Sequence, residues 1–186
     1  MPGEEQSIDN ILRDREVGYL LSPVRITLLE NLPAIQVGEV SLEASQAGTT
    51  LEVPRWVAEI ITRSGLADMA EESLDAELFK AISRERIQGS AQLASLKEDF
   101  HLKVHRHLSH SSIQSETNPE TRDTYEKLSI TAYDLVTMRM VKVIQLAASR
   151  SPPLDIFEKI TLEEKLLFNQ VQQLVNHWRS SILGGT

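Results

Sequence analysis

The chain has no cysteine, few aromatic residues (5%) and no long apolar run. Without cysteine it cannot form disulfides, thiolate metal sites or a cysteine nucleophile. No apolar run approaches the roughly 20 residues that a membrane helix needs. The polar, acidic stretch 1–10 does not fit a signal peptide. We therefore expect a soluble, intracellular protein with no membrane contact, packed mainly by aliphatic side chains.

The charge is unevenly distributed along the 186 residues, although the net value is only −8. Residues 1–75 carry 14 acidic and 5 basic side chains, whereas residues 76–186 carry 13 and 14. Affinity for DNA comes largely from neutralising phosphates, so the acidic front part favours basic partner proteins over nucleic acid. We expect weak or no direct DNA binding.

Residues 24–53 have the pattern of short strands. Val24, Ile26 and Leu28 alternate with polar residues, which is the period of a half-buried strand. Similar short runs follow at 35–37, 40–44 and 51–53, and they are separated by proline and glycine. This spacing predicts a small, mostly antiparallel sheet.

A helix is expected directly after these strands, with Pro54 as its first residue because proline is tolerated there. Gly65 is placed for a left-handed cap, and Leu66 for packing back onto the helix. Residues 24–68 would then form a small unit of sheet and helix, which at this size needs a neighbour for stability.

The remaining sequence has helical periodicity. It predicts helices over 73–111, bent near Gly89, and over 119–149, joined by an exposed loop at 110–118. At 1.5 Å per residue these helices would be about 40–55 Å long. Thr161–Glu164 matches the S/T-x-x-E capping box of a last helix.

The predicted fold is mainly α: an N-terminal extension (1–23), a small β-rich α+β domain (24–68) and a helical bundle domain (69–186). Helices this long outreach a compact bundle. We therefore expect their apolar stripes to continue into another chain.

The histidines offer the one candidate metal site. His101 and His105 are four residues apart and would share a helix face. Leu102 stands where an H-E-x-x-H site has its glutamate. A solvated helix end is the favoured interpretation, and a metal-dependent hydrolase is the less favoured alternative.

Other catalytic patterns are absent from the sequence. There is no G-x-x-x-x-G-K-[ST] or G-x-G-x-x-G loop, and Gly89-Ser90 lacks the frame of a serine nucleophile. The paired carboxylates are adjacent on helices and point about 100° apart, so they do not converge. We expect no enzyme activity and no cofactor. Arg139, Lys142 and Arg150 form a modest basic stripe that favours a solvated face or an inter-subunit ion pair over nucleic acid.

Three segments resemble the subunits of the GINS complex of DNA replication. Residues 49–58, leading to Gly65-Leu66-Ala67, resemble the family's strand followed by Pro-x-Trp-hydrophobic-Ala. Residues 139–143 resemble its Arg-hydrophobic-hydrophobic-Lys-hydrophobic segment. Residues 160–164 resemble the Leu-Thr-x-x-Glu start of its closing helix. The segments occur in the family's order.

The resemblance implies a particular subunit class. With the β-rich domain first, the chain is similar to the class related to the eukaryotic partner-of-Sld-five subunits, which in archaea pairs with a helical-domain-first paralogue in a 2:2 heterotetramer. The short loop at 68–80 favours an archaeal source. The implied role is a non-catalytic scaffold that ties the MCM helicase to a factor of the Cdc45/RecJ type and contacts primase or DNA polymerase. The implied location is the archaeal cytoplasm or nucleoid, or a nucleus in a eukaryote.

Under this interpretation the helix over 119–149 contributes to the subunit interface, and Pro54 and Trp56 make contacts of the small domain. A helical adaptor unrelated to replication is the alternative. For Leu135 a purely intramolecular role is the competing account. The positions expected at the subunit interface are Leu128, Ala132, Leu135, Arg139, Lys142, Val171, Leu174 and Trp178.

Overall fold

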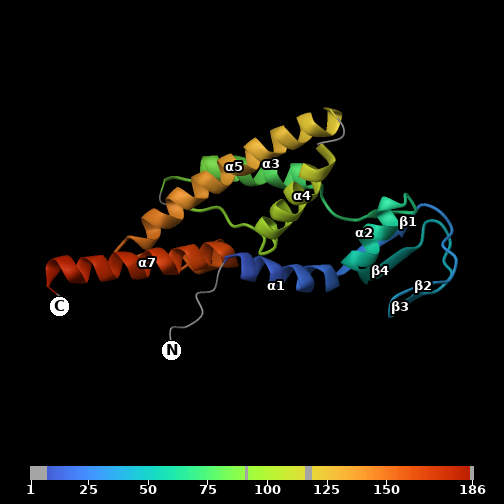
Figure 1. Ribbon diagram of the computed structural model, residues 1–186, viewed down its shortest axis with the longest axis horizontal. Helices are drawn as coiled ribbons and strands as arrows, with labels where there is room; N and C mark the ends of the chain where they lie inside the picture. Colours follow the sequence, from blue (N-terminus) through green and yellow to red (C-terminus); the bar gives the residue numbers. More distant parts are fainter. Residues whose placement is uncertain (1–7, 91, 116–118, 185–186) are drawn as a thin grey trace. The chain divides into compact units, whose positions relative to one another are not determined.

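The structure is a computed structural model that describes residues 8–90, 92–115 and 119–184 (Figure 1). The chain divides into two compact units, Met1–Glu72 and Ser73–Thr186. Helices dominate, and within the described ranges strands occur only in the first unit, so the predicted mainly α fold with a small α+β part is confirmed. None of the described helices is long and apolar enough to cross a membrane.

A three-stranded antiparallel sheet in the order β4-β1-β5 forms the centre of the first unit. The central strand β1 (Pro23–Leu28) pairs with β4 (Thr50–Pro54) and with β5 (Ala67–Met69). The alternate side chains of β1 are buried, as their period-two pattern predicts. The strand β5 was not predicted from the sequence, because three residues are too few to show the alternation of apolar and polar side chains.

A separate hairpin joins β2 (Ile35–Val37) to β3 (Val40–Leu42). Its two-residue turn begins at Gly38, whose φ of +63° is a conformation that glycine adopts without steric cost. Both short strands were predicted from their punctuation by proline and glycine.

Two helices complete the first unit. The helix α1 (Ile8–Leu21) occupies most of the segment that was expected only to be an N-terminal extension. The helix α2 (Arg55–Arg63) packs Val57 and Ile61 against the sheet. Pro54 is not the first residue of α2: it pairs in β4 and takes the N-cap position with a ψ of 142°.

The end of α2 agrees with the expected left-handed cap. Gly65 has a φ of +74°, and its N–H donates to the carbonyl of Thr62 at 2.9 Å. The N–H of Leu66 donates to the carbonyl of Ile61 at 3.2 Å. These two bonds define a Schellman motif, which satisfies carbonyls that the helix end would leave unpaired.

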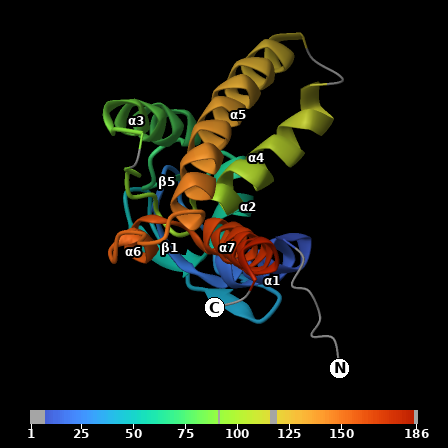
Figure 2. The same ribbon diagram turned by 90° about the vertical axis from the view of Figure 1, so that its left-hand side faces the viewer.

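The second unit contains five described helices: α3 (Leu74–Ile87), α4 (Phe100–Ser115), α5 (Pro119–Ala147), α6 (Ile156–Lys159) and α7 (Leu162–Leu183). Figure 2 shows α5 running beside α4 and meeting α7 near its own C-terminal end. With 29 residues, α5 is about 43 Å long, within the expected range. In Figure 1 the C-terminal part of α7 extends past the end of α5.

The single bent helix expected over 73–111 is wrong. The helix α3 ends at Ile87, and the next described helix begins at Phe100. The intervening segment is not helical. Leu93 and Ala94 are buried in the unit, and the backbone N–H and carbonyl of Ala94 hydrogen-bond to charged side chains. The expected loop at 110–118 is also wrong for its first part, because α4 continues to Ser115; residues 116–118 lie outside the described part.

Two apolar clusters form the core of this unit. The first joins α3, α4 and the N-terminal half of α5 through Leu78, Phe100 and Leu135. The second joins Leu93, the C-terminal half of α5, α6 and α7 through Val143 and Phe168. The helix α5 therefore passes through both clusters with one continuous buried face.

Candidate functional site

A buried charged cluster lies between the two apolar clusters of the second unit, with Arg139 of α5 at its centre. The side chain of Arg139 is 1% exposed. Its Nε and Nη2 donate to the two carboxylate oxygens of Glu164 at 2.6 and 2.8 Å. Its Nη1 donates to Glu85 at 2.7 Å and to the carbonyl of Ala94 at 2.7 Å, and its Nη2 also donates to the carbonyl of Lys159 at 3.2 Å. All five N–H groups of the guanidinium are therefore used.

The two carboxylates are satisfied as completely as the arginine. Glu85 also accepts from the ammonium of Lys142 at 2.6 Å and from the N–H of Ala94 at 3.2 Å. Glu164 also hydrogen-bonds to His101 Nε2 at 3.1 Å and accepts from the N–H of Thr161 at 3.0 Å. The two carboxylates face one guanidinium and one ammonium, and His101 is a further partner of Glu164.

The electrostatics of Glu164 follow from these contacts. Burial is the largest single effect and opposes ionisation of the Glu164 carboxyl. The hydrogen bonds and charges of Arg139 and His101 together outweigh the effect of burial. The pKa of Glu164 falls from 4.5 to about 2 as a result. For Arg139, burial likewise favours the neutral form, but Glu164 and Glu85 reverse that effect and raise its pKa. The ion pair between Arg139 and Glu164 therefore favours the charged form of both partners.

The cluster is a structural link rather than a reactive centre. It connects α3, α5 and α7 directly, reaches α4 through His101, and takes the carbonyl at the end of α6. General acid–base chemistry needs a group with a pKa near the working pH that faces a substrate. Here both carboxylates are buried and engaged, and the pKa of Glu164 is moved away from neutrality.

The histidines do not gather into a site. His101 is tied to Glu164, whereas His105, His107 and His110 are exposed on α4. Over the described ranges, no three histidine, aspartate or glutamate side chains are arranged to hold a metal ion. The Thr161 capping box is confirmed, and its glutamate is the same Glu164 that binds Arg139.

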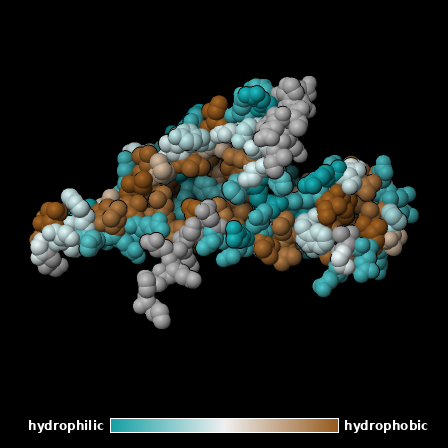
Figure 3. All heavy atoms as spheres, viewed as in Figure 1, coloured by the Kyte–Doolittle hydropathy of each residue, from teal (hydrophilic) through white to brown (hydrophobic). Residues whose placement is uncertain are grey.

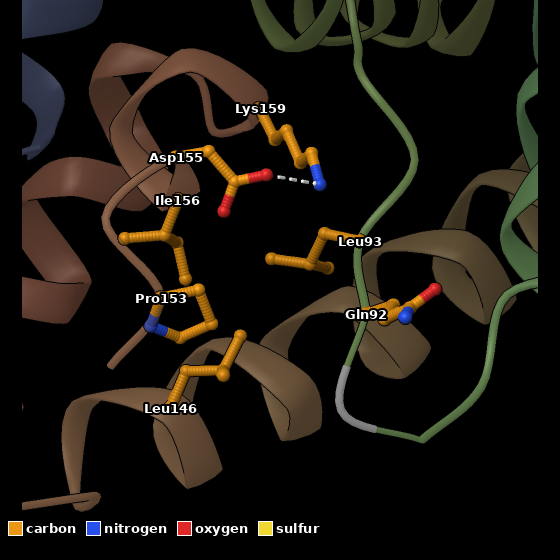
Figure 4. Close-up of a pocket in the computed structure, with 7 residues that line it drawn as sticks. All are labelled: Gln92, Leu93, Leu146, Pro153, Asp155, Ile156 and Lys159. Carbon is orange, nitrogen blue, oxygen red and sulfur yellow. Dashed lines mark ion pairs between the residues drawn. The ribbon is translucent and has the colours of Figure 1, made fainter. Parts of the chain in front are cut away.

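A pocket of about 190 Å³ lies beside the cluster, in the second unit (Figure 4). Its volume is below the ~300–1,000 Å³ typical of small-molecule sites. Its two charged residues, Asp155 and Lys159, bind each other at 2.7 Å across the rim instead of converging on the cavity. Its lining is Gln92, Leu93, Leu146, Pro153, Asp155, Ile156 and Lys159.

The residues expected at a subunit interface fall into two groups. Leu128, Ala132, Leu135 and Arg139 are at most 5% exposed, because they pack against the chain's own helices. A partner chain would not reach them in this conformation, and Leu135 belongs to the intramolecular core, as its competing account held. Their helical period was correctly recognised, but a period does not say which chain covers the face.

The other expected positions are nearer the surface. Lys142 is mostly covered by its contact with Glu85, and Val171 is half-buried. Leu174 and Trp178 are 69% and 62% exposed on α7. Ile182, an apolar position of the last helix that was not among the expected interface residues, continues the same line at 64% exposure, and its spacing of four residues from Trp178 was the available signal.

The first unit has a smaller buried cation that was also overlooked. Arg55, at the start of α2, donates from Nη1 and Nη2 to the carboxylate of Glu71 at 2.7 and 2.6 Å. Its guanidinium carbon lies 4.1 Å from the centre of the Tyr19 ring, so it links α1 to the start of α2. Its neighbours Pro54 and Trp56 are half-buried, and Trp56 packs against the core of the unit.

The buried cations therefore hold each unit together, while the apolar side chains of α7 are presented to solvent. No catalytic constellation is formed by the groups described above. In comparisons with known proteins, no family model matches the chain and no curated protein is significantly similar to it.

Proposed function

We propose that the chain is a non-catalytic scaffold subunit of the GINS type, acting in DNA replication. The resemblance in three ordered segments supports this. Two of those segments, 139–143 and 160–164, supply the two sides of the Arg139–Glu164 ion pair. The residues that carry the resemblance thus have a joint role, which is to fix the start of α7 against α5.

The observation that carries the scaffold role is the exposed apolar line on α7. Leu174, Trp178 and Ile182 are each more than 60% exposed and lie one turn apart on one face. Tryptophan is among the residues most enriched in binding hot spots, and Trp178 faces solvent. We assign this line to the helical-domain-first paralogue of a 2:2 heterotetramer.

The mechanism is coupling by binding, without chemistry. A scaffold that holds the MCM helicase, a Cdc45/RecJ-type factor and primase or polymerase favours the conformations to which they bind together. It shifts populations by differential affinity alone. The acidic first part of the chain suits contacts with basic protein surfaces rather than with DNA.

The test is co-expression with a helical-domain-first paralogue, followed by size-exclusion chromatography with light scattering. We expect a 2:2 complex for the unaltered chain. Trp178→Glu should weaken it at least 30-fold, because a hot-spot tryptophan is worth about 2 kcal/mol or more. Gln173→Glu is the matched control: it adds the same charge to an exposed position of α7 on the opposite face.

Two outcomes would favour the alternatives. Absence of any complex with the paralogue would contradict the replication role and favour an unrelated helical adaptor. Stoichiometric zinc in the purified protein, lost together with a hydrolytic activity on replacing His101 and His105 by alanine, would favour the hydrolase.

A further inference from the structure

A second apolar face runs along α5 on the side away from the core. Its side chains are between 37% and 72% exposed, although they belong to the most deeply packed helix of the unit. Figure 3 shows hydrophobic residues gathered over the C-terminal half of α5. A surface helix normally has one apolar stripe and a polar remainder, so two stripes indicate that both sides are covered in the working protein. The residues of this outer face are Ile130, Tyr133, Val136, Met140, Val141 and Ile144.

The area of the outer face is sufficient for a stable contact. Weighted by their exposures, the six side chains present on the order of 600 Å² of apolar surface, so two such faces would bury roughly 1,200 Å² together. That is the lower limit of stable, specific protein interfaces. Such a patch is also at the upper end of what a monomeric protein leaves uncovered.

Four of the six outer-face side chains are placed symmetrically about Thr137, whereas Val136 and Met140 have no counterpart in the outer face. Ile130 and Ile144 lie about two helical turns to either side of it, and Tyr133 and Val141 about one turn to either side. A two-fold interface brings the same patch of both subunits together, so each residue meets its mirror position. Antiparallel pairing about Thr137 would therefore place each isoleucine against the other and each tyrosine against a valine.

The charge of the second unit permits this contact. Residues 76–186 carry 13 acidic and 14 basic side chains, so two copies of this region do not repel each other. We propose that the outer face of α5 binds the same face of a second copy of this chain, antiparallel about a two-fold axis through Thr137. The contact uses a different surface from the α7 line, and it does not depend on the proposed replication role.

Single-cysteine variants test the geometry directly, because the chain has no cysteine of its own. Thr137→Cys lies on the axis. Helices packed about 8–10 Å apart bring facing Cα atoms within disulfide range. Mild oxidation of the full chain should convert most of this variant to a covalent dimer. Gln145→Cys, exposed on α5 but away from the face, is the control and should give at least tenfold less.

A mixing experiment fixes the direction of the pairing. Ile130→Cys and Ile144→Cys should each stay uncrosslinked alone and form a covalent dimer when mixed. Self-crosslinking of Ile130→Cys would mean a parallel pair, and equal yields from Thr137→Cys and Gln145→Cys would mean random collision. Either result would overturn the proposal.

Light scattering supplies the independent readout. The unaltered chain should be dimeric at micromolar concentration, and the double variant Ile130→Glu/Ile144→Glu should be monomeric with an unchanged far-ultraviolet circular dichroism spectrum. Gln145→Glu should stay dimeric. A monomeric unaltered chain overturns the proposal. If the dimer forms but no complex with the paralogue does, the homotypic contact stands and the replication role fails.

Discussion

Each of the two units of the chain contains a buried arginine, and the surroundings of the two arginines differ. In the first unit Arg55 meets Glu71, whose side chain remains 33% exposed. In the second, Arg139 meets two carboxylates that are 0% and 9% exposed, with two carbonyls filling the remaining donors. Water can replace a lost partner only in the first case.

This difference determines how much each arginine matters. A buried ion pair is not strongly stabilising against an apolar replacement of the whole cluster, but removing one partner leaves an uncompensated buried charge. The second unit therefore depends on Arg139 for its folding stability. Arg55 adds the face of the Tyr19 ring to a half-solvated pair, which is a weaker and more tolerant arrangement.

The largest expected effect comes from Arg139→Met. It should lower the free energy of unfolding of the second unit by about 3–5 kcal/mol, because Glu164 and Glu85 then stay buried without the guanidinium that they share, although Lys142 still pairs with Glu85. Arg55→Met should cost only about 1–3 kcal/mol, since Glu71 can be hydrated. Urea unfolding followed by circular dichroism measures the first effect. For the second, Trp56 fluorescence in a Trp178→Phe background reports on the first unit. Equal costs would remove the distinction between the two clusters.

The next effect is the response of the second unit to acid. The folded-state pKa of Glu164, about 2, lies below its ordinary 4.5, so its contribution is fully present above pH 4.5 and is lost as the pH falls toward 2. The loss should be about 3 kcal/mol over that window. Other carboxylates titrate there too, so the measurement is the difference between the unaltered chain and Glu164→Gln in urea unfolding at each pH. Parallel curves would contradict the assignment.

Much of the fold was predictable because its signals are local. The strands around Val24 and Val53, the cap at Gly65 and the capping box at Thr161 depend on alternation, backbone conformation or a four-residue motif. The errors occurred where distant contacts decide. The segment with Leu93 and Ala94 interrupts the predicted helix, and its backbone is bound by Glu85 and by Arg139, which lies 45 residues further along the chain.

The candidate surfaces were predictable in part for the same reason. The sequence shows that α5 is apolar beyond one stripe, but not which stripe faces the chain's own core. Leu135 and Ile130 have the same chemistry and opposite environments, at 0% and 63% exposure. Arg139 was noticed as part of a basic stripe, but its partners lie on α3 and α7, so its burial had no local signal.

The smallest expected effect concerns two hydrogen bonds at helix caps, one buried and one open to solvent. Thr161 caps α7 and Ser73 caps α3, and each side-chain oxygen accepts from a helix N–H at 3.4 Å. Thr161 is 2% exposed, whereas Ser73 is exposed to solvent. The two bonds have equal length and differ in access to water.

Thr161→Ala should therefore cost about 1–2 kcal/mol of unfolding free energy, and Ser73→Ala about 0.5 kcal/mol, because water can take over the N–H only at the exposed cap. Thr161→Ser keeps the hydroxyl and should recover most of the loss, which separates the cap from the missing methyl group. Urea unfolding of the three variants by circular dichroism measures these costs. If Ser73→Ala were as costly as Thr161→Ala, burial would not be what sets the strength of these polar contacts.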